Sequence, residues 1–199
     1  MEINRIVICL TNDIRFDRRI QRTVHALSES DKYEVSVLCR DLHHSSLEID
    51  DEIPSSKINC FFNKGFLFYA EFNLRLILRL LNSKNDTIVS VDYDTIIACS
   101  LSSRILGVKL IFDAHEMYEE SIELVRRPLI RRFWKWVGKT FVRNVHRSYT
   151  VSHSIAQKYS KIHHQPFYVV RNIPSLLTSN RRNDLKNLYS SHQLPNDVH

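Results

Sequence analysis

The chain has 199 residues, of which 43% are hydrophobic and 10% aromatic, and its formal charge is +6. This composition supports a folded core and argues against extended disorder, and the length suits one domain with a short tail. No uncharged apolar run reaches about 18 residues, and residues 1–10 lack the apolar region and cleavage site of a secretory signal. We therefore expect neither a transmembrane helix nor a signal peptide.

The predicted elements alternate between strand and helix along the chain. We predict strands at 5–10, 33–39, 58–63, 87–91, 109–112, 148–151 and 168–170, and helices at 15–28, 65–82, 95–106, from Pro128 onward and from Ser152 to about Lys161. Residues 40–56 are predicted as a loop, and Gly107 as a helix C-cap. This alternation predicts an α/β fold, Rossmann-like and doubly wound, with a mainly parallel sheet flanked by helices.

Cysteine and histidine spacing gives no metal or redox motif. Cys9, Cys39, Cys60 and Cys99 are widely separated, so we interpret them as small buried hydrophobes in a reducing compartment. The histidine pairs at 43–44 and 163–164 have no third ligand at helical spacing. We expect no metal and no cofactor.

Polar residues follow nearly every predicted strand. They are Asn12 and Asp13, Asn63, Asp92 and Asp94, Asp113 to Glu116, Ser152 and Asn172. Because the carboxyl ends of parallel strands form the binding crevice of an open sheet, we expect these residues to converge on one edge. For Asp94, capping of the following helix competes with a ligand role.

The segment 109–116 is the most informative of these strand ends, since a buried strand runs directly into Asp113, His115 and Glu116. A histidine beside two carboxylates at this edge suits proton transfer or the holding of a polar ligand. The competing interpretation is that these side chains only cap a helix and bond to backbone. Arg15, Arg18 and Arg19, past the first strand, are placed to reach a phosphate, or to form ordinary surface ion pairs.

The positive charge is concentrated in one segment. Eight basic residues and no acidic residue lie between Leu124 and Arg147, so the remaining chain carries a formal charge of −2. On a helical wheel, one stripe holds Arg131, Lys135, Lys139 and Arg143, with Arg132 and Trp136 beside it, and the opposite side holds Ile130, Phe133, Trp134, Val137, Phe141 and Val145. A tryptophan among arginines suits an anionic membrane surface. The alternative is a solvated basic face, and no recognised nucleic-acid-binding module is present.

Several motifs in order give the chain a family resemblance: Asn12-Asp13 with Asp17-Arg18-Arg19-Ile20, Val91-Asp92-Tyr93-Asp94-Thr95, Phe112-Asp113-Ala114-His115-Glu116, Thr150-Val151-Ser152 and Val169 to Pro174. Over residues 5–174 they resemble the amino-terminal half of retaining GT-B glycosyltransferases, and most closely bacterial enzymes of surface-polysaccharide synthesis. The chain departs from that family in one respect: the loop after its first strand has no glycine, and the whole chain has three. This departure argues against tight nucleotide diphosphate binding by this half alone.

The resemblance implies a domain organisation and a function. Residues 1–174 would be an acceptor-binding domain, and residues 175–199 a linker leading to a donor-binding domain outside this chain. The activity would be transfer of a sugar, with retention, from a nucleotide-sugar donor to a glycan or lipid-linked acceptor. We expect a cytoplasmic protein, peripheral to the inner face of the cell membrane, with no nucleic-acid partner, whose isolated acceptor-side chain is inactive.

The resemblance also assigns roles to residues. His115 would face the donor sugar as the catalytic residue. Acceptor or donor binding would involve Asn12, Asp13, Arg15, Arg19, Asp92, Asp94, Asp113, Glu116, Ser152 and Asn172. Membrane-facing residues would be Arg131, Arg132, Lys135, Trp136, Lys139 and Arg143.

Two other functions remain open at this level. The first is a non-enzymatic Rossmann-like or flavodoxin-like module that docks a partner through its basic helix. The second is a fragment of a nucleotide-sugar epimerase, against which we count the missing glycine-rich loop and the lack of a Tyr-x-x-x-Lys pair.

Overall fold

A computed structural model describes residues 3–42, 53–115, 117 and 127–173. Its sheet has seven strands, all parallel, in the order β3-β2-β1-β4-β5-β6-β7. The strands are β1 (Asn4–Leu10), β2 (Tyr33–Arg40), β3 (Ser55–Ile58), β4 (Thr87–Val91), β5 (Lys109–Ala114), β6 (Arg147–Thr150) and β7 (Phe167–Val169). The predicted Rossmann-like α/β class is confirmed.

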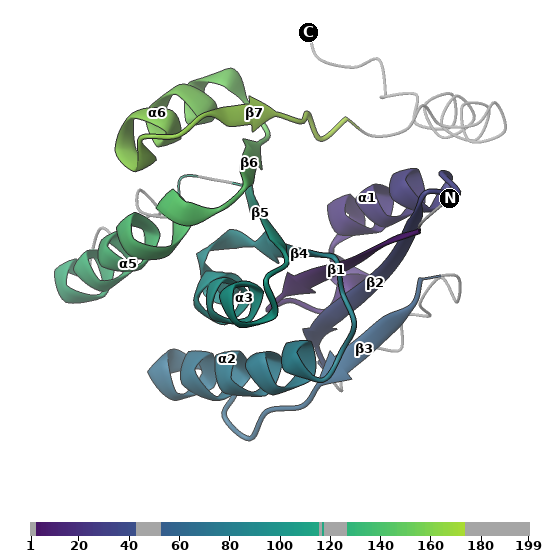
Figure 1. The fold of residues 1–199 in the computed structure, drawn as a ribbon. Helices are drawn as coiled ribbons and strands as arrows, with labels where there is room; N and C mark the ends of the chain where they lie inside the picture. The colour runs from purple at the N-terminus through teal and green to yellow at the C-terminus, as the bar shows by residue number, and fades with distance from the viewer. Residues whose placement is uncertain (1–2, 43–52, 116, 118–126, 174–199) are drawn as a thin grey trace, which may run out of the picture.

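Helices cover both faces of this sheet (Figure 1). One face carries α1 (Arg18–Ser28), which follows a 3-10 turn, η1 (Ile14–Phe16). The other carries α2 (Gly65–Leu81), α3 (Asp92–Leu106), α5 (Pro128–Phe141) with η3 (Val142–Asn144), and α6 (His153–His163). Each face has its own buried apolar cluster, as expected when amphipathic helices pack on a sheet whose central strands are apolar on both sides.

The strand order fixes where a ligand crevice can lie. The chain leaves β1 toward one face, through α1, and leaves the neighbouring β4 toward the other, through α3. The carboxyl ends of β1 and β4 therefore flank the topological switch point, where open α/β sheets bind ligands.

Three elements have a boundary that differs from the sequence prediction by three residues or more. The strand predicted at 58–63 is wrong for most of its length, because β3 is Ser55–Ile58 and Ile58 pairs with Arg40 at the end of β2. The helix predicted from residue 15 begins at Arg18, where the Asp17 carboxylate accepts hydrogen bonds from the backbone of Arg19 and Ile20. The helix predicted from residue 95 begins at Asp92, so Asp92 and Asp94 lie in its first turn.

The loop between β3 and α2 is held by Glu71, a residue that follows it in the sequence. The Glu71 carboxylate accepts hydrogen bonds from the backbone of Phe61 at 2.9 Å and of Phe62 at 3.0 Å, and from Arg75 Nε at 2.8 Å. Backbone groups that would otherwise extend β3 are thus satisfied by a side chain. The Phe61 ring stays 85% exposed.

Gly107 and three of the four cysteines lie as the sequence predicted. Gly107 ends α3 in the left-handed conformation, with φ of 69°. Cys9, Cys39 and Cys99 are buried and Cys60 is partly buried, all as free thiols. Within the described ranges, no helix is long and apolar enough to span a bilayer, and no three metal-ligating side chains form a cluster. The predicted tail at 175–199 lies outside the described residues, as does most of the predicted loop at 40–56.

Candidate functional site

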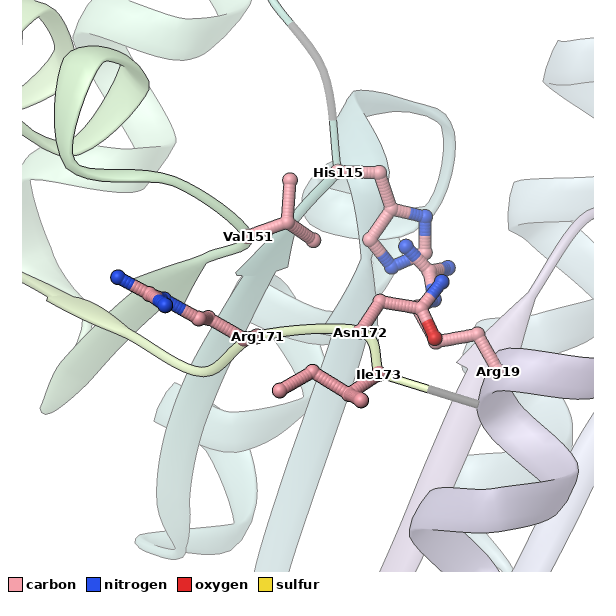
Figure 2. Close-up of a pocket in the computed structure, with 6 residues that line it drawn as sticks. All are labelled: Arg19, His115, Val151, Arg171, Asn172 and Ile173. Atoms are coloured by element: carbon pink, nitrogen blue, oxygen red, sulfur yellow. The ribbon is translucent and has the colours of Figure 1, made fainter. Parts of the chain in front are cut away.

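A pocket of about 530 Å³ lies at the carboxyl edge of the sheet, beside the switch point. It is lined by Arg19 of α1, His115 after β5, Val151 after β6, and the segment Arg171, Asn172 and Ile173 after β7. The side chains of His115, Arg19 and Asn172 point toward one another, whereas Arg171 extends away from them (Figure 2). Segments far apart in sequence thus meet around His115, at the edge where the sequence predicted convergence.

The His115 ring lies between two carboxylates. Its Nδ1 is 3.1 Å from Asp92 Oδ2, and its Nε2 is 3.1 Å from Asp113 Oδ2. The contact at Nδ1 is on the side where Asp92 also accepts a hydrogen bond from the His115 backbone N–H, at 3.0 Å. The contact at Nε2 is close but poorly aligned, so Nε2 has no hydrogen-bond partner among the described residues. The His115 side chain is 15% exposed, and the ring lines the pocket instead of being sealed in the core.

Asp113 is the buried member of this group. Burial raises its pKa to about 6, although the nearby Arg19 charge and a hydrogen bond with the Tyr149 side chain act in the opposite direction. The same burial, together with the Asp113 charge, holds the pKa of Tyr149 well above its ordinary value. Tyr149 stands opposite Asp113 in the β5–β6 register, so the sheet itself sets this pair.

Arg19 is the cation closest to this arrangement. Its Nη2 is 3.5 Å from Asp17 Oδ2, while its Nε is buried without a hydrogen-bond partner among the described residues. Asn172 is fixed from the same helix, because Arg22 donates a hydrogen bond to its side-chain oxygen. The α1 helix therefore supplies a guanidinium to the pocket, from Arg19, and holds Asn172 in the pocket wall through Arg22.

The structure does not bring Asp13 and Arg15 into the pocket. Asp13 is fully buried, and its carboxylate accepts hydrogen bonds from Arg15 and from the backbone of Leu42. Burial acts to raise the Asp13 pKa, but these hydrogen bonds bring it below the ordinary value. In this structure both side chains hold η1 to the segment after β2, and their predicted ligand role stays a prediction.

Other predicted site residues also have local partners. Asn12 accepts a hydrogen bond from the Asp13 backbone, Asp94 accepts one from the Thr11 hydroxyl at 2.9 Å, and Ser152 caps α6. None of these three lines the pocket. Glu116, predicted beside His115, lies outside the described residues.

The basic stripe lies on the outer side of α5. Arg132, Lys135, Lys139 and Arg143 are exposed, Arg131 is half-buried, and Trp136 is 55% exposed. Trp134, Val137, Phe141 and Val145 are buried as expected, but Ile130 and Phe133 are not, being 40% and 38% exposed. The prediction of a packed side is wrong for these two residues, because the stripe that packs is narrower at the first turns of α5.

Sequence reasoning missed three contributions to the site. Val151 and Ile173 line the pocket as apolar residues at strand ends, where only polar residues had been selected. Tyr149, which bonds to Asp113, lies inside a strand. Its signal was available in principle, because aligning the parallel strands β5 and β6 pairs the two residues.

Comparison with known proteins identifies the family and the fold. Residues 17–173 match the model of glycosyltransferase family 4. The comparison with curated proteins found no match. Solved structures do match it: a lipopolysaccharide outer core galactosyltransferase, WaaB, has 14% identity and a TM-score of 0.58, with 87% of this chain and 47% of that protein covered.

Two further structures show how widely this fold is used. UGT2 of Phytolacca americana, solved with UDP-2-fluoro-glucose and pterostilbene, has 10% identity and a TM-score of 0.57, covering 94% of this chain and 57% of that one. The UDP-GlcNAc 2-epimerase of Methanocaldococcus jannaschii has 13% identity and a TM-score of 0.53, with 85% and 45% covered. The chain spans about half the length of these structures.

The structural likenesses establish the fold alone, since transferases and an epimerase share it. Because an epimerase has this fold as well, the lack of a Tyr-x-x-x-Lys pair is not enough to distinguish a transferase from an epimerase. The family match identifies the family, and it spans most of the described chain, including His115 and the pocket. The chain belongs to glycosyltransferase family 4.

Proposed function

We propose that this chain is the acceptor-side part of an enzyme that transfers a sugar, with retention, from a nucleotide-sugar donor to a glycan or lipid-linked acceptor. We assign the reaction to the synthesis of cell-surface polysaccharide. Residues 1–174 form the acceptor-binding domain in this proposal, and residues 175–199 lead to a donor-binding domain. The observation that carries the proposal is the placement of His115 in a pocket at the carboxyl edge of the sheet, beside the switch point and next to an arginine.

The chemistry of transfer suits these residues. The reaction develops positive charge on the sugar ring and negative charge on the departing diphosphate. An imidazole held by carboxylates can orient a sugar hydroxyl at the reacting centre, and the Arg19 guanidinium can lie near the phosphate charge. The pocket thus offers one hydrogen-bonding group and one cation within the same 530 Å³. Asn172, which also lines the pocket and accepts a hydrogen bond from Arg22 of α1, is an uncharged donor and acceptor for a sugar hydroxyl.

The test is an assay of the product of the complete reading frame that encodes this chain. It is incubated with a panel of nucleotide sugars and membrane extracts, and nucleotide release and the anomeric configuration of the product are measured. We expect His115→Ala to lower turnover by about a hundredfold or more, as for loss of a positioned catalytic histidine. The matched control is His153→Ala, since His153 is an exposed residue at the start of α6 and away from the pocket.

The assay also separates the alternatives. Equal turnover in His115→Ala and the control would overturn the catalytic role of His115, and an inverted product would overturn retention. Conversion of the donor to an epimer without transfer would indicate an epimerase. We expect residues 1–199 alone to release no nucleotide, and turnover by this chain alone would refute the need for a second domain.

We also propose that the protein is cytoplasmic and lies on the inner face of the cell membrane through the outer side of α5. Exposed basic residues there surround Trp136, and Leu129 is 82% exposed at the first turn. Basic residues near an anionic surface contribute about 1 kcal/mol each, and a tryptophan suits the headgroup region. The exposed rings of Phe61 and Phe66 add apolar surface at the start of α2, which meets α5 where Tyr69 packs on Trp134.

Vesicle sedimentation tests this membrane proposal. Reversing two charges, Lys135→Glu with Lys139→Glu, is expected to weaken binding to phosphatidylglycerol vesicles by at least about tenfold. The matched control is Lys32→Glu with Lys109→Glu, which makes the same change in net charge at exposed positions on the amino edge of the sheet. Equal binding by both pairs would overturn docking through α5. If the α5 variant binds lipid normally but no longer binds a partner protein, the non-enzymatic module that docks a partner through its basic helix would be favoured instead.

A further inference from the structure

Asp92 makes two contacts to the same distant residue. Its Oδ1 accepts the His115 backbone N–H at 3.0 Å, and its Oδ2 lies 3.1 Å from His115 Nδ1. A carboxylate in the first turn of a helix commonly bonds to that helix's own N–H groups. Here both oxygens of the Asp92 carboxylate reach across from the start of α3 to the end of β5. The side chain therefore fixes both the backbone and the ring of His115.

The backbone of Asp92 is unusual as well. Its φ is +57°, in the left-handed region that residues other than glycine seldom adopt, although aspartate and asparagine tolerate it best. Such a conformation at the first residue of α3 persists only where the surrounding structure favours it, and it is found most often at functional sites. The turn gives Asp92 the direction it needs to reach His115.

We propose that Asp92 is a positioning residue that fixes the His115 ring and holds a proton on its Nδ1, while Nε2 is turned toward the buried Asp113. In a histidine, the hydrogen bond made by one ring nitrogen decides which nitrogen carries the proton. A carboxylate can only accept, so its contact at Nδ1 requires Nδ1–H. The sequence had offered Asp92 as a ligand for acceptor hydroxyls, and the geometry gives it this different role. The inference rests on the proposed function for its consequence in catalysis, but not for the contact itself.

Nuclear magnetic resonance of the imidazole nitrogens tests the contact directly. At pH 8, the two-bond proton–nitrogen correlations of the 199-residue chain are expected to show Nδ1–H for His115, with the signal assigned by its loss in His115→Gln. Asp92→Asn keeps the shape of the side chain, and asparagine also tolerates the left-handed backbone conformation. Its amide can donate a hydrogen bond to Nδ1, so we expect the ring proton of His115 to move to Nε2. Asp92→Gly removes the side chain and relieves the backbone, and we expect the Nε2–H form that an unconstrained histidine side chain prefers. Persistence of Nδ1–H in both variants would overturn the proposal.

A turnover measurement on the product of the complete reading frame gives the second arm. We expect Asp92→Asn to lower kcat by about tenfold or more with little change in KM, and the double variant Asp92→Asn with His115→Ala to be no slower than His115→Ala alone. A double variant much slower than His115→Ala would show that Asp92 touches substrate itself, which overturns the positioning role. If the proton moves but turnover does not change, the positioning role of Asp92 in catalysis is overturned and only its contact with His115 stands; the catalytic role of His115 is judged separately by His115→Ala.

Discussion

Substituting Gly138 by alanine tests how closely α5 packs on the start of α3. A Cβ at Gly138 would lie 2.3 Å from Tyr93 Cε1 and 2.9 Å from the Tyr93 hydroxyl. Tyr93 cannot move aside easily, because it is 1% exposed, packs edge-on against Phe112 and bonds through its hydroxyl to His163 Nε2 at 2.9 Å. The added methyl group therefore meets a rigid ring at a distance that real Cβ atoms do not show.

Two opposing effects set the magnitude. Overpacking a core of this kind costs about 1–3 kcal/mol, and a carbon contact this short belongs at the upper end of that range. Replacing a helical glycine by alanine returns about 1 kcal/mol through helix propensity. We expect a net loss of about 2 kcal/mol, which in a chain of this size lowers the melting temperature by about 4–8 °C.

Thermal and urea unfolding of the chain would measure this loss. Gly107→Ala is the matched control, because its Cβ would meet nothing within 4 Å and its cost comes only from a φ of +69°. Adding Tyr93→Leu to Gly138→Ala should give a smaller total loss than the sum of the single losses, because the ring that clashes is gone. A Gly138→Ala variant as stable as the wild type would refute the close packing of α5 on α3.

The remaining predictions concern ionisable groups. Burial lowers the pKa of His163 to about 4, so the neutral ring's contribution to stability is lost as the pH falls from about 6.5 to 4. Urea titrations of His163→Gln should therefore lack about 3 kcal/mol of the change in unfolding free energy that the wild type shows over this pH range. An equal pH dependence in both proteins would contradict this prediction. The raised pKa of Asp113 acts in the reverse direction, since stability is lost as the pH rises from about 4 to 6. Across that range the stability of Asp113→Asn relative to the wild type should rise by up to about 3 kcal/mol. A stability difference that does not change with pH would contradict the cost of burying the ionised Asp113 carboxylate. Glu71→Ala should speed amide exchange at Phe61 and Phe62 more than at Val89 in the sheet, and equal protection in both proteins would show that Glu71 does not hold this loop.

The sequence predicted the outline of the site because topology decides most of it. Strands and helices that alternate must give parallel strands, and parallel strands must end at one edge. His115, Asp92 and Asp113 follow or end strands, and the structure brings each carboxylate within 3.1 Å of the His115 ring. What pattern alone could not show is which polar strand ends are already satisfied. Asp13 and Arg15 bond to each other, a choice that depends on side-chain reach and burial and not on order along the chain.

The error at β3 has a similar cause. Residues 58–63 are rich in apolar side chains, as a strand would be, and local propensity favours extension there. The pairing with β2 nevertheless ends at Ile58, and Glu71 takes the next backbone donors, so a long-range side chain outweighs a local preference. The result is an exposed Phe61 at the same edge of the sheet as the pocket, and propensity alone gives no indication of it.

One turn of α3 connects the two surfaces to which we assign function. Tyr93 packs under Gly138 of α5, the helix that we place on the membrane, and the preceding residue, Asp92, reaches His115 in the pocket. Spatial continuity of this kind is not by itself energetic coupling. It does explain the glycine in the middle of α5, because a Cβ there would meet the ring of Tyr93, the residue next to the carboxylate that contacts His115.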